Sequence, residues 1–189
     1  MKKILVINGS PNKKGHTKNI VEKVLSTIDT SKADIINVDC YKKQIMPCVD
    51  CKGCSHKLGQ CSIKDDMEPI YDYLKNCDII ILASPMYFGM FPAPLKAIMD
   101  RCQLIWSEKY IFNKTTKPKK GILIFDGGTE WKNMYMPMET IAKYFFNTLN
   151  CTIEYKLFIA NTDKDHHYLE NNAASILSCQ ETISNLLEI

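Results

Sequence analysis

The chain has 189 residues, of which 46% are hydrophobic and 24% are charged, and its formal net charge is +3. This length and composition predict one soluble globular domain over residues 1–189, with enough chain to bury a full core. The charge is too small to favour a nucleic-acid partner, and no segment is long and apolar enough to predict insertion into a membrane.

The N-terminal segment begins like a signal peptide, with Lys2 and Lys3 ahead of an apolar run. The run is short and stops at the turn that starts with Gly9, so it is more typical of a first strand. Nine cysteines without a secretion signal predict a reducing, cytoplasmic location, where clustered thiols hold metal rather than form disulfides.

Along the whole chain, continuous apolar runs alternate with segments in which apolar residues recur at the spacing of a helix. Strands are expected at residues 3–8, 34–39, 78–83, 121–125 and 152–160. Helices are expected to start at Thr17, at Asp65 and Asp66 and at Pro94, and to cover 138–146 and 169–187. The third run is apolar throughout, as in a strand buried on both faces, whereas the fifth alternates like a half-exposed edge strand.

Five strands that alternate with helices predict a three-layer α/β sandwich of the flavodoxin-like type, with a parallel sheet in the order 2-1-3-4-5. Ligands of such sheets bind at the carboxyl ends of the strands. The loops 9–17, 84–93 and 126–133 would therefore meet at one edge, and a cysteine-rich segment, 40–64, leaves the same edge after the second strand.

The cysteine motif is Cys48-x2-Cys51-x2-Cys54-x6-Cys61. Three closely spaced thiols and a fourth nearby suit a 4Fe-4S cluster, in which each iron takes one thiolate. Structural zinc sites usually take two separated pairs of ligands, so zinc fits less well, and unligated or redox-active thiols are a further alternative. The other five cysteines are explained by packing in a core or an interface.

The first loop, Gly9 to Thr17, joins a strand to the start of a helix, where free amides and the helix dipole favour a phosphate group. The hydroxyls of Ser10 and Thr17 are expected to be additional donors. The loop matches neither a P-loop nor the G-x-G-x-x-G fingerprint, so the phosphate monoester of FMN fits better than a nucleoside triphosphate. The alternative is a tight turn in which Thr17 only caps its helix.

Two other loops predict a flat ligand at the same edge. Ser84 to Pro92 is unusually apolar for a loop and would lie against an aromatic ring system or under a dimer partner. Gly127 and Gly128 would let the backbone approach a ligand, although a plain turn is also consistent. His166 and His167 lie in a polar segment and are expected at the surface, as are the lysines between 114 and 120.

The chain resembles the NADPH-dependent FMN reductase group of flavodoxin-like proteins and, within it, the iron–sulfur flavoproteins. Four elements carry the resemblance, in the family's order: Gly9-Ser10-Pro11 with Gly15 and Thr17; the cysteine motif; Asp65-Asp66-Met67; and Ser84-Pro85-Met86-Tyr87-Phe88-Gly89 with Pro94-Leu95-Lys96 and Asp100-Arg101. Asn12 stands where the family often has Arg, and His16 where it often has Asn, so the affinity for FMN rather than its identity is in question. Lys13, Lys14 or Lys18 would supply the missing charge.

This resemblance implies noncovalently bound FMN, a 4Fe-4S cluster and a homodimer or dimer of dimers. The cluster ligands would be Cys48, Cys51, Cys54 and Cys61. We predict that the FMN site includes Ser10, Asn12, His16, Thr17, Lys18, Pro85, Met86, Tyr87, Phe88, Gly89, Gly127, Gly128 and Thr129. No side chain is assigned as a catalytic acid, base or nucleophile, because the cofactors carry the chemistry.

The expected function is that of an oxidoreductase that passes electrons between the cluster and FMN, with NAD(P)H or a small redox carrier protein as the donor. Two alternatives remain. One is an NAD(P)H-dependent FMN or quinone reductase without a functional cluster, and the other is a non-enzymatic redox or metal sensor built on the cysteine motif.

Overall fold

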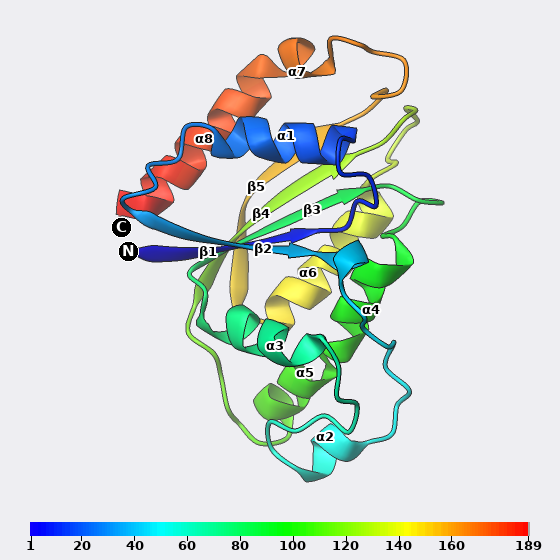
Figure 1. The fold of residues 1–189 in the computed structure, drawn as a ribbon, viewed down its shortest axis with the longest axis vertical. Helices are drawn as coiled ribbons and strands as arrows, with labels where there is room; N and C mark the ends of the chain where they lie inside the picture. Colours follow the sequence, from blue (N-terminus) through cyan, green and yellow to red (C-terminus); the bar gives the residue numbers. More distant parts are fainter. Residues whose placement is uncertain (189) are drawn as a thin grey trace.

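The computed structural model describes residues 1–188 and contains a five-stranded parallel sheet in the order β2-β1-β3-β4-β5 (Figure 1). This is the predicted flavodoxin-like order. The strands are β1 (Lys2–Asn8), β2 (Ala33–Asp39), β3 (Ile79–Pro85), β4 (Lys119–Asp126) and β5 (Cys151–Ile159).

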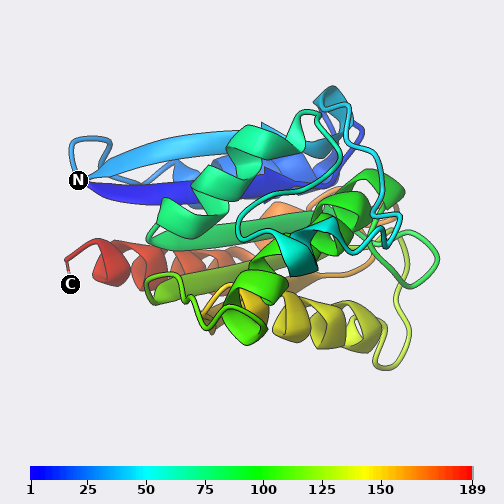
Figure 2. The same cartoon turned by 90° about the horizontal axis from the view of Figure 1, so that it is seen from below.

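Helices follow the strands and cover both faces of the sheet (Figures 1 and 2). On one face lie α1 (His16–Leu25), α7 (Tyr168–Asn171) and α8 (Ala173–Glu188). On the other face lie α3 (Met67–Asn76), α4 (Ala93–Arg101), α5 (Gln103–Tyr110) and α6 (Met136–Thr148). The segment after β2 contains the short 3₁₀ helix η1 (Cys40–Lys42) and the single-turn α2 (Gly53–His56).

The burial of the strands explains their order. From Ile79 to Ser84 every residue of β3 is buried, because both faces of this central strand are covered by helices. In β5 half-buried and exposed positions alternate from Cys151 to Lys156, as predicted for an edge strand. Two apolar cores result, one between the sheet and α1 with α8, the other between the sheet and the helices α3 to α6.

The helices differ from the sequence prediction at two points. The predicted helix over 169–187 is divided into α7 and α8 at Asn172. The helix that starts near Pro94 ends at Arg101, and α5 starts anew at Gln103. The amide of Cys102 donates to the carbonyls of Ile98 and Met99, while the carbonyl of Cys102 accepts from Trp106, so hydrogen bonding continues through the break. No glycine or proline marks this point, and the pattern alone therefore gave no signal.

Lys119 also differs from the prediction, because its side chain is buried rather than solvated. It lies in β4, and its ammonium group donates to the carbonyls of Lys117 and Leu149, at 2.8 and 3.2 Å. Burial lowers the pKa of Lys119.

The strands point their carboxyl ends toward one edge, on the right in Figure 1, and the loops after β1, β3 and β4 meet there. From the same edge the cysteine segment runs down across the green helices of residues 93–110 (Figures 1 and 2). Within residues 1–188 no helix has the length and hydropathy needed to cross a membrane.

Candidate functional site

A cavity of about 290 Å³ opens at the carboxyl edge of the sheet, between the loops after β1, β3 and β4. Nearly all the residues predicted for FMN in the first loop line it, together with part of the aromatic loop and the paired glycines. Its lining residues are Ser10, Asn12, Gly15, His16, Thr17, Pro85, Met86, Tyr87, Asp126, Gly127, Gly128, Thr162 and Asp163.

The start of α1 is free to bind an anion. Gly15 is the N-cap residue and brings no side-chain cap, so the first-turn amides of α1 keep their hydrogen-bonding capacity. The loop before it is held by its own bonds: the amide of Lys14 donates to Asn12 Oδ1 at 3.0 Å, and the amide of Ser10 donates to Asn8 Oδ1 at 2.9 Å.

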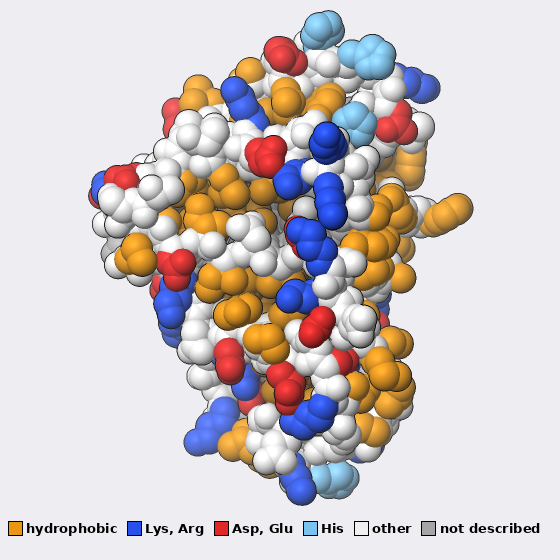
Figure 3. Space-filling model, in the orientation of Figure 1, with side chains coloured by type: hydrophobic (Ala, Val, Ile, Leu, Met, Phe, Trp, Pro, Cys, Tyr) orange, Lys and Arg blue, Asp and Glu red, His pale blue; other side chains and the backbone are white. Residues whose placement is uncertain are grey.

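Positive charge lies beside this helix start. A smaller cavity of about 100 Å³ adjoins the first loop, and Lys13, Lys18 and Lys42 line it. Figure 3 shows basic side chains gathered on this face, over the start of α1 and the segment after β2. Lys18 lines this second cavity rather than the one at the sheet edge.

Thr17 is almost fully buried, and its hydroxyl donates to Asp126 Oδ1 at 2.6 Å. Its proton is therefore engaged within the protein, which differs from the expectation of a free donor to a ligand. Asp126, at the end of β4, is 4% exposed. Burial raises the pKa of Asp126 to about 6, although the Thr17 hydroxyl and His16 act in the opposite direction.

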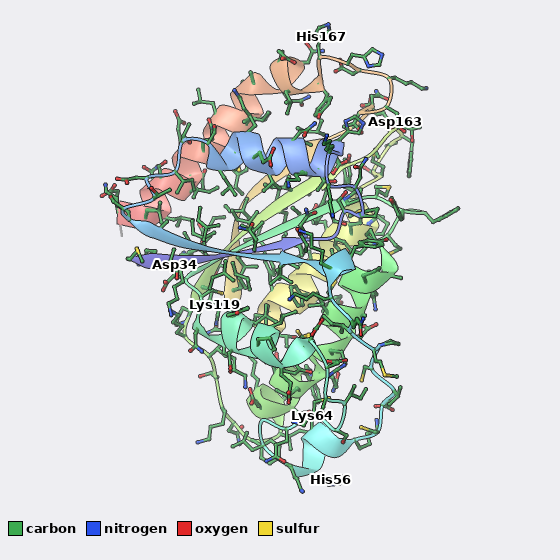
Figure 4. The ribbon with its side chains drawn as sticks, viewed as in Figure 1. Asp34, His56, Lys64, Lys119, Asp163 and His167 are labelled. Atoms are coloured by element: carbon green, nitrogen blue, oxygen red, sulfur yellow. The ribbon has the colours of Figure 1, made fainter. Side chains whose placement is uncertain are left out.

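His16 lies between the first loop and the segment after β5. Its Nε2 is 3.6 Å from Asp163 Oδ1, and its ring meets that of Tyr168 edge to face at 5.0 Å between centroids. Nδ1 of His16 is buried and has no partner among residues 1–188. In Figure 4 Asp163 lies at the sheet edge near the start of α1, far from His56 in the cysteine segment.

Asp163 lies close to one of the paired glycines. A Cβ atom at position 128 would lie 2.0 Å from Asp163 Oδ2, so a side chain there would require the exposed carboxylate of Asp163 to move. His166 and His167, a few residues after Asp163, are exposed as predicted. Thr162 and Asp163 were not predicted as site residues, because nothing in the local pattern joins them to the first loop. Asp126 lies in the predicted loop 126–133, of which only Gly127, Gly128 and Thr129 were predicted for the site.

The apolar loop after β3 divides into a lining half and an exposed tip. Tyr87 and Met90 exchange backbone hydrogen bonds of 2.9 Å around a turn in which Phe88 and Gly89 have φ values of 51° and 76°. Phe88 is fully exposed, whereas Phe91 is buried against Phe125. Of the predicted FMN residues, Phe88, Gly89 and Thr129, like Lys18, do not line the edge cavity.

A separate cavity of about 210 Å³ is lined by all four cysteines of the motif. It lies between the cysteine segment and the start of α5, and shares no residue with the edge cavity. Its other lining residues are Val49, Asp50, Lys52, Ser55, Ile63, Arg101, Gln103, Leu104 and Trp106.

The thiols of this cavity differ in their surroundings. Cys54 lies against α5, where the Ser107 hydroxyl donates to its Sγ at 3.6 Å. The amide of Gly53 and the hydroxyl of Ser62 lower the pKa of the Cys51 thiol, which favours the thiolate form that metals bind. All nine cysteines of the chain are free thiols.

Within residues 1–188 no three His, Cys, Asp or Glu side chains are placed to hold a single metal ion. Zinc requires its ligand atoms about 2.3 Å from one point. A cluster instead takes each thiolate on a different iron, so ligands that surround a cavity fit a cluster better than a single ion.

Comparison with known proteins identifies the family. The family model for NADPH-dependent FMN reductases matches residues 2–129. An iron–sulfur flavoprotein of Archaeoglobus fulgidus is 32% identical over 143 residues, which cover 75% of this chain and 70% of that protein. One of Methanocaldococcus jannaschii is 37% identical over 99 residues, which cover 52% of this chain and only 51% of the relative.

The fold comparison reaches further along the chain. An FMN-dependent NADH-azoreductase of Bacillus anthracis, solved in complex with FMN, superposes with a TM-score of 0.71 at 17% identity, covering 99% of this chain and 100% of the other. At that identity the likeness shows the flavodoxin-like fold alone.

The family match thus gives the class, a flavin-dependent oxidoreductase with a flavodoxin-like fold. This chain belongs to the NADPH-dependent FMN reductase family and, within it, to the iron–sulfur flavoproteins.

Proposed function

We propose that this chain binds FMN in the edge cavity and a 4Fe-4S cluster in the cysteine cavity, and that it passes electrons between them. The observation that carries this proposal is the gathering of Cys48, Cys51, Cys54 and Cys61 around one cavity, separate from the cavity at the sheet edge. When bound, the cluster supplies single-electron transfer, and FMN couples single-electron carriers to two-electron reactions.

At the edge cavity the protein's task is binding and orientation. The uncapped amides of α1 and the neighbouring Lys13 and Lys18 suit a phosphate dianion. Met86 and Tyr87 offer an apolar wall for a flat ring, and the backbone at Gly127 and Gly128 lines the cavity directly.

At the cysteine cavity the protein's task is to hold four thiolates around a shielded space. Leu104 and Trp106 make one side of this cavity apolar, which limits the access of water to a bound group. The lowered pKa of Cys51 and the docking of Cys54 on α5 prepare two of the ligands.

The arrangement also supports electron transfer between subunits. Helix α4 starts just after the aromatic loop and ends at Arg101, which lines the cysteine cavity, and no residue lines both cavities of one chain. In a homodimer or a dimer of dimers, the cysteine cavity of one subunit could face the edge cavity of another. NAD(P)H or a small redox carrier is the proposed donor, in a reducing cytoplasm.

The test is the composition of protein purified without oxygen. We expect up to about one FMN and close to four irons and four sulfides per chain, with a broad visible absorbance that dithionite bleaches. Released flavin that proves to be FAD, or no binding of added FMN, would overturn the flavin assignment. Stoichiometric zinc in the anaerobic protein would overturn the cluster assignment.

A second candidate is an NAD(P)H-dependent FMN or quinone reductase without a functional cluster. It is favoured by the exposure of Cys48 and Cys51. Rapid bleaching of bound flavin by NADPH in protein with its cysteine motif alkylated would support this candidate.

A further inference from the structure

Arg101, the last residue of α4, lies under the cysteine cavity and lines it. Its side chain is only 1% exposed. Nη1 donates to the carbonyl of Met46 at 2.9 Å and to Asp65 Oδ2 at 2.7 Å. Nη2 donates to the carbonyl of Ile63 at 3.1 Å and to Asp65 Oδ1 at 3.2 Å.

These contacts join the two ends of the cysteine segment. Met46 precedes the first cysteine of the motif by two residues, and Ile63 follows the last by two. Asp65 also accepts from the amide of Met46 at 2.9 Å. One buried ion pair therefore closes the base of the loop that carries all four thiols.

The guanidinium keeps one donor unused. It has five N–H groups, and the four bonds above involve only Nη1 and Nη2. Nε is buried and has no partner among residues 1–188. Buried donors are normally paired, so an unpaired one next to a lined cavity indicates an acceptor that the protein itself does not supply.

Charge near Arg101 points to the same cavity. Burial alone would lower the pKa of Arg101, but its hydrogen bonds to Asp65 raise it, and Tyr71 and, to a smaller extent, Cys61 act in the same direction. Arg101 is thus a fixed cation close to one of the four motif thiols.

We propose that the Nε–H of Arg101 donates to a sulfur of the cluster or of its ligand Cys61, and that Arg101 thereby makes the cluster's reduction potential more positive. Arg101 also closes the base of the loop that carries the cysteines. This inference rests on the proposed function. An electron that enters the cluster adds negative charge, and a neighbouring donor and cation stabilise that reduced form. Arg101 is a positioning residue in this role and transfers no proton.

The test compares two variants of the full chain after anaerobic cluster assembly. Arg101→Gln removes the cation and the Nε–H, and its cluster is expected to titrate at a more negative potential than that of the wild type. Asp65→Asn keeps the arginine but leaves its charge unneutralised, and its cluster is expected at a more positive potential. A purely structural role would weaken the loop in both variants and could not shift the two potentials in opposite directions.

A second measurement needs no cluster. In cluster-free protein, both variants are expected to increase severalfold the rate at which a thiol reagent modifies the four motif cysteines, because the base of the loop opens. Lys96→Gln is the matched control: it removes a cation from the same helix, where Lys96 pairs with Asp100 in solvent. Its potential and thiol reactivity should equal those of the wild type.

Equal potentials in Arg101→Gln and the wild type, or shifts of both variants in one direction, would overturn the inference. If Arg101→Gln does not fold, Arg101→Lys replaces it, since lysine keeps the charge but has no Nε–H; its potential should still fall, and an unchanged value overturns the inference. Failure of the wild type to take up iron and sulfide would be a different result, which overturns the proposed function itself.

Discussion

Asp126 is the residue whose surroundings are most unusual at the edge cavity. It is a buried carboxyl group held by one hydroxyl, and burial raises its pKa from 3.8 to about 6. Between these two values the folded state binds more protons at Asp126 than the unfolded state does. Its contribution to stability is therefore largest at acid pH and is lost as the pH rises through about 6.

Asp126→Asn should remove this loss of stability at higher pH. The amide has the shape of the carboxyl group and accepts the hydrogen bond from the Thr17 hydroxyl, but it does not ionise. In cofactor-free protein, we expect the variant to be more stable than the wild type at neutral pH by on the order of 2 kcal/mol. At strongly acid pH the difference should vanish. Urea unfolding across this pH range measures both values.

Asp72→Asn serves as the control for that experiment. Asp72 is exposed on α3 and does not line the edge cavity, so its substitution should leave the pH dependence of unfolding nearly unchanged. An Asp126→Asn variant with the same pH dependence as the wild type would contradict the assignment of the raised pKa.

At the scale of elements, the cysteine segment is a unit distinct from the loops of the sheet edge. It packs on α5 through Cys54 and is closed at its base by Arg101 and Asp65. No residue lines both the cysteine cavity and the edge cavity.

Cys54→Ser should therefore lose the cluster and keep FMN. The serine removes one of four thiolate ligands, while the loops that line the edge cavity are untouched. Iron, sulfide and flavin contents of anaerobically purified protein give the answer. Cys151→Ser is the control, since Cys151 lies in β5 outside the motif and should leave all three contents as in the wild type. Joint loss of FMN and iron in Cys54→Ser would show that the two sites are not separable.

At the scale of the whole molecule, two loops at the sheet edge carry exposed aromatic side chains. Tyr87 is 44% exposed and Phe88 fully exposed, while Trp131 in the loop after β4 is 51% exposed. Figure 3 shows hydrophobic side chains along the side of the molecule on which these loops lie. Soluble monomers rarely leave such patches uncovered, and a two-fold symmetric dimer is the commonest way to bury one.

We expect the protein to be at least a dimer at micromolar concentration and Phe88→Glu to shift it toward the monomer. A buried charge at the centre of an apolar interface costs far more than an exposed one. Light scattering coupled to gel filtration measures the mass. Leu177→Glu, at an exposed position on α8, should not change it. A monomeric wild type with reducible FMN would count against both the interface and electron transfer between subunits.

Much of this architecture follows from the sequence alone. Apolar runs define five strands, and apolar stripes define the main helices. This works because a buried strand and a buried helix face each need apolar residues at a characteristic spacing along the chain. The run Ile79 to Leu82 predicts a central strand, and the alternation in β5 predicts an edge. The break at Cys102 escaped prediction, since its hydrogen bonds continue through the turn.

The sequence by itself also determined which chemistry the chain can support. The four closely spaced cysteines, and the loop that joins the first strand to the start of a helix, are made of residues close together in the chain. Only the tertiary structure decided which distant groups meet at those features. Thr17 and Asp126 are 109 positions apart in the chain, and Arg101 lies 36 positions from Asp65 and 55 from Met46. These contacts depend on strand register and helix packing, which the spacing of apolar residues within one segment does not determine.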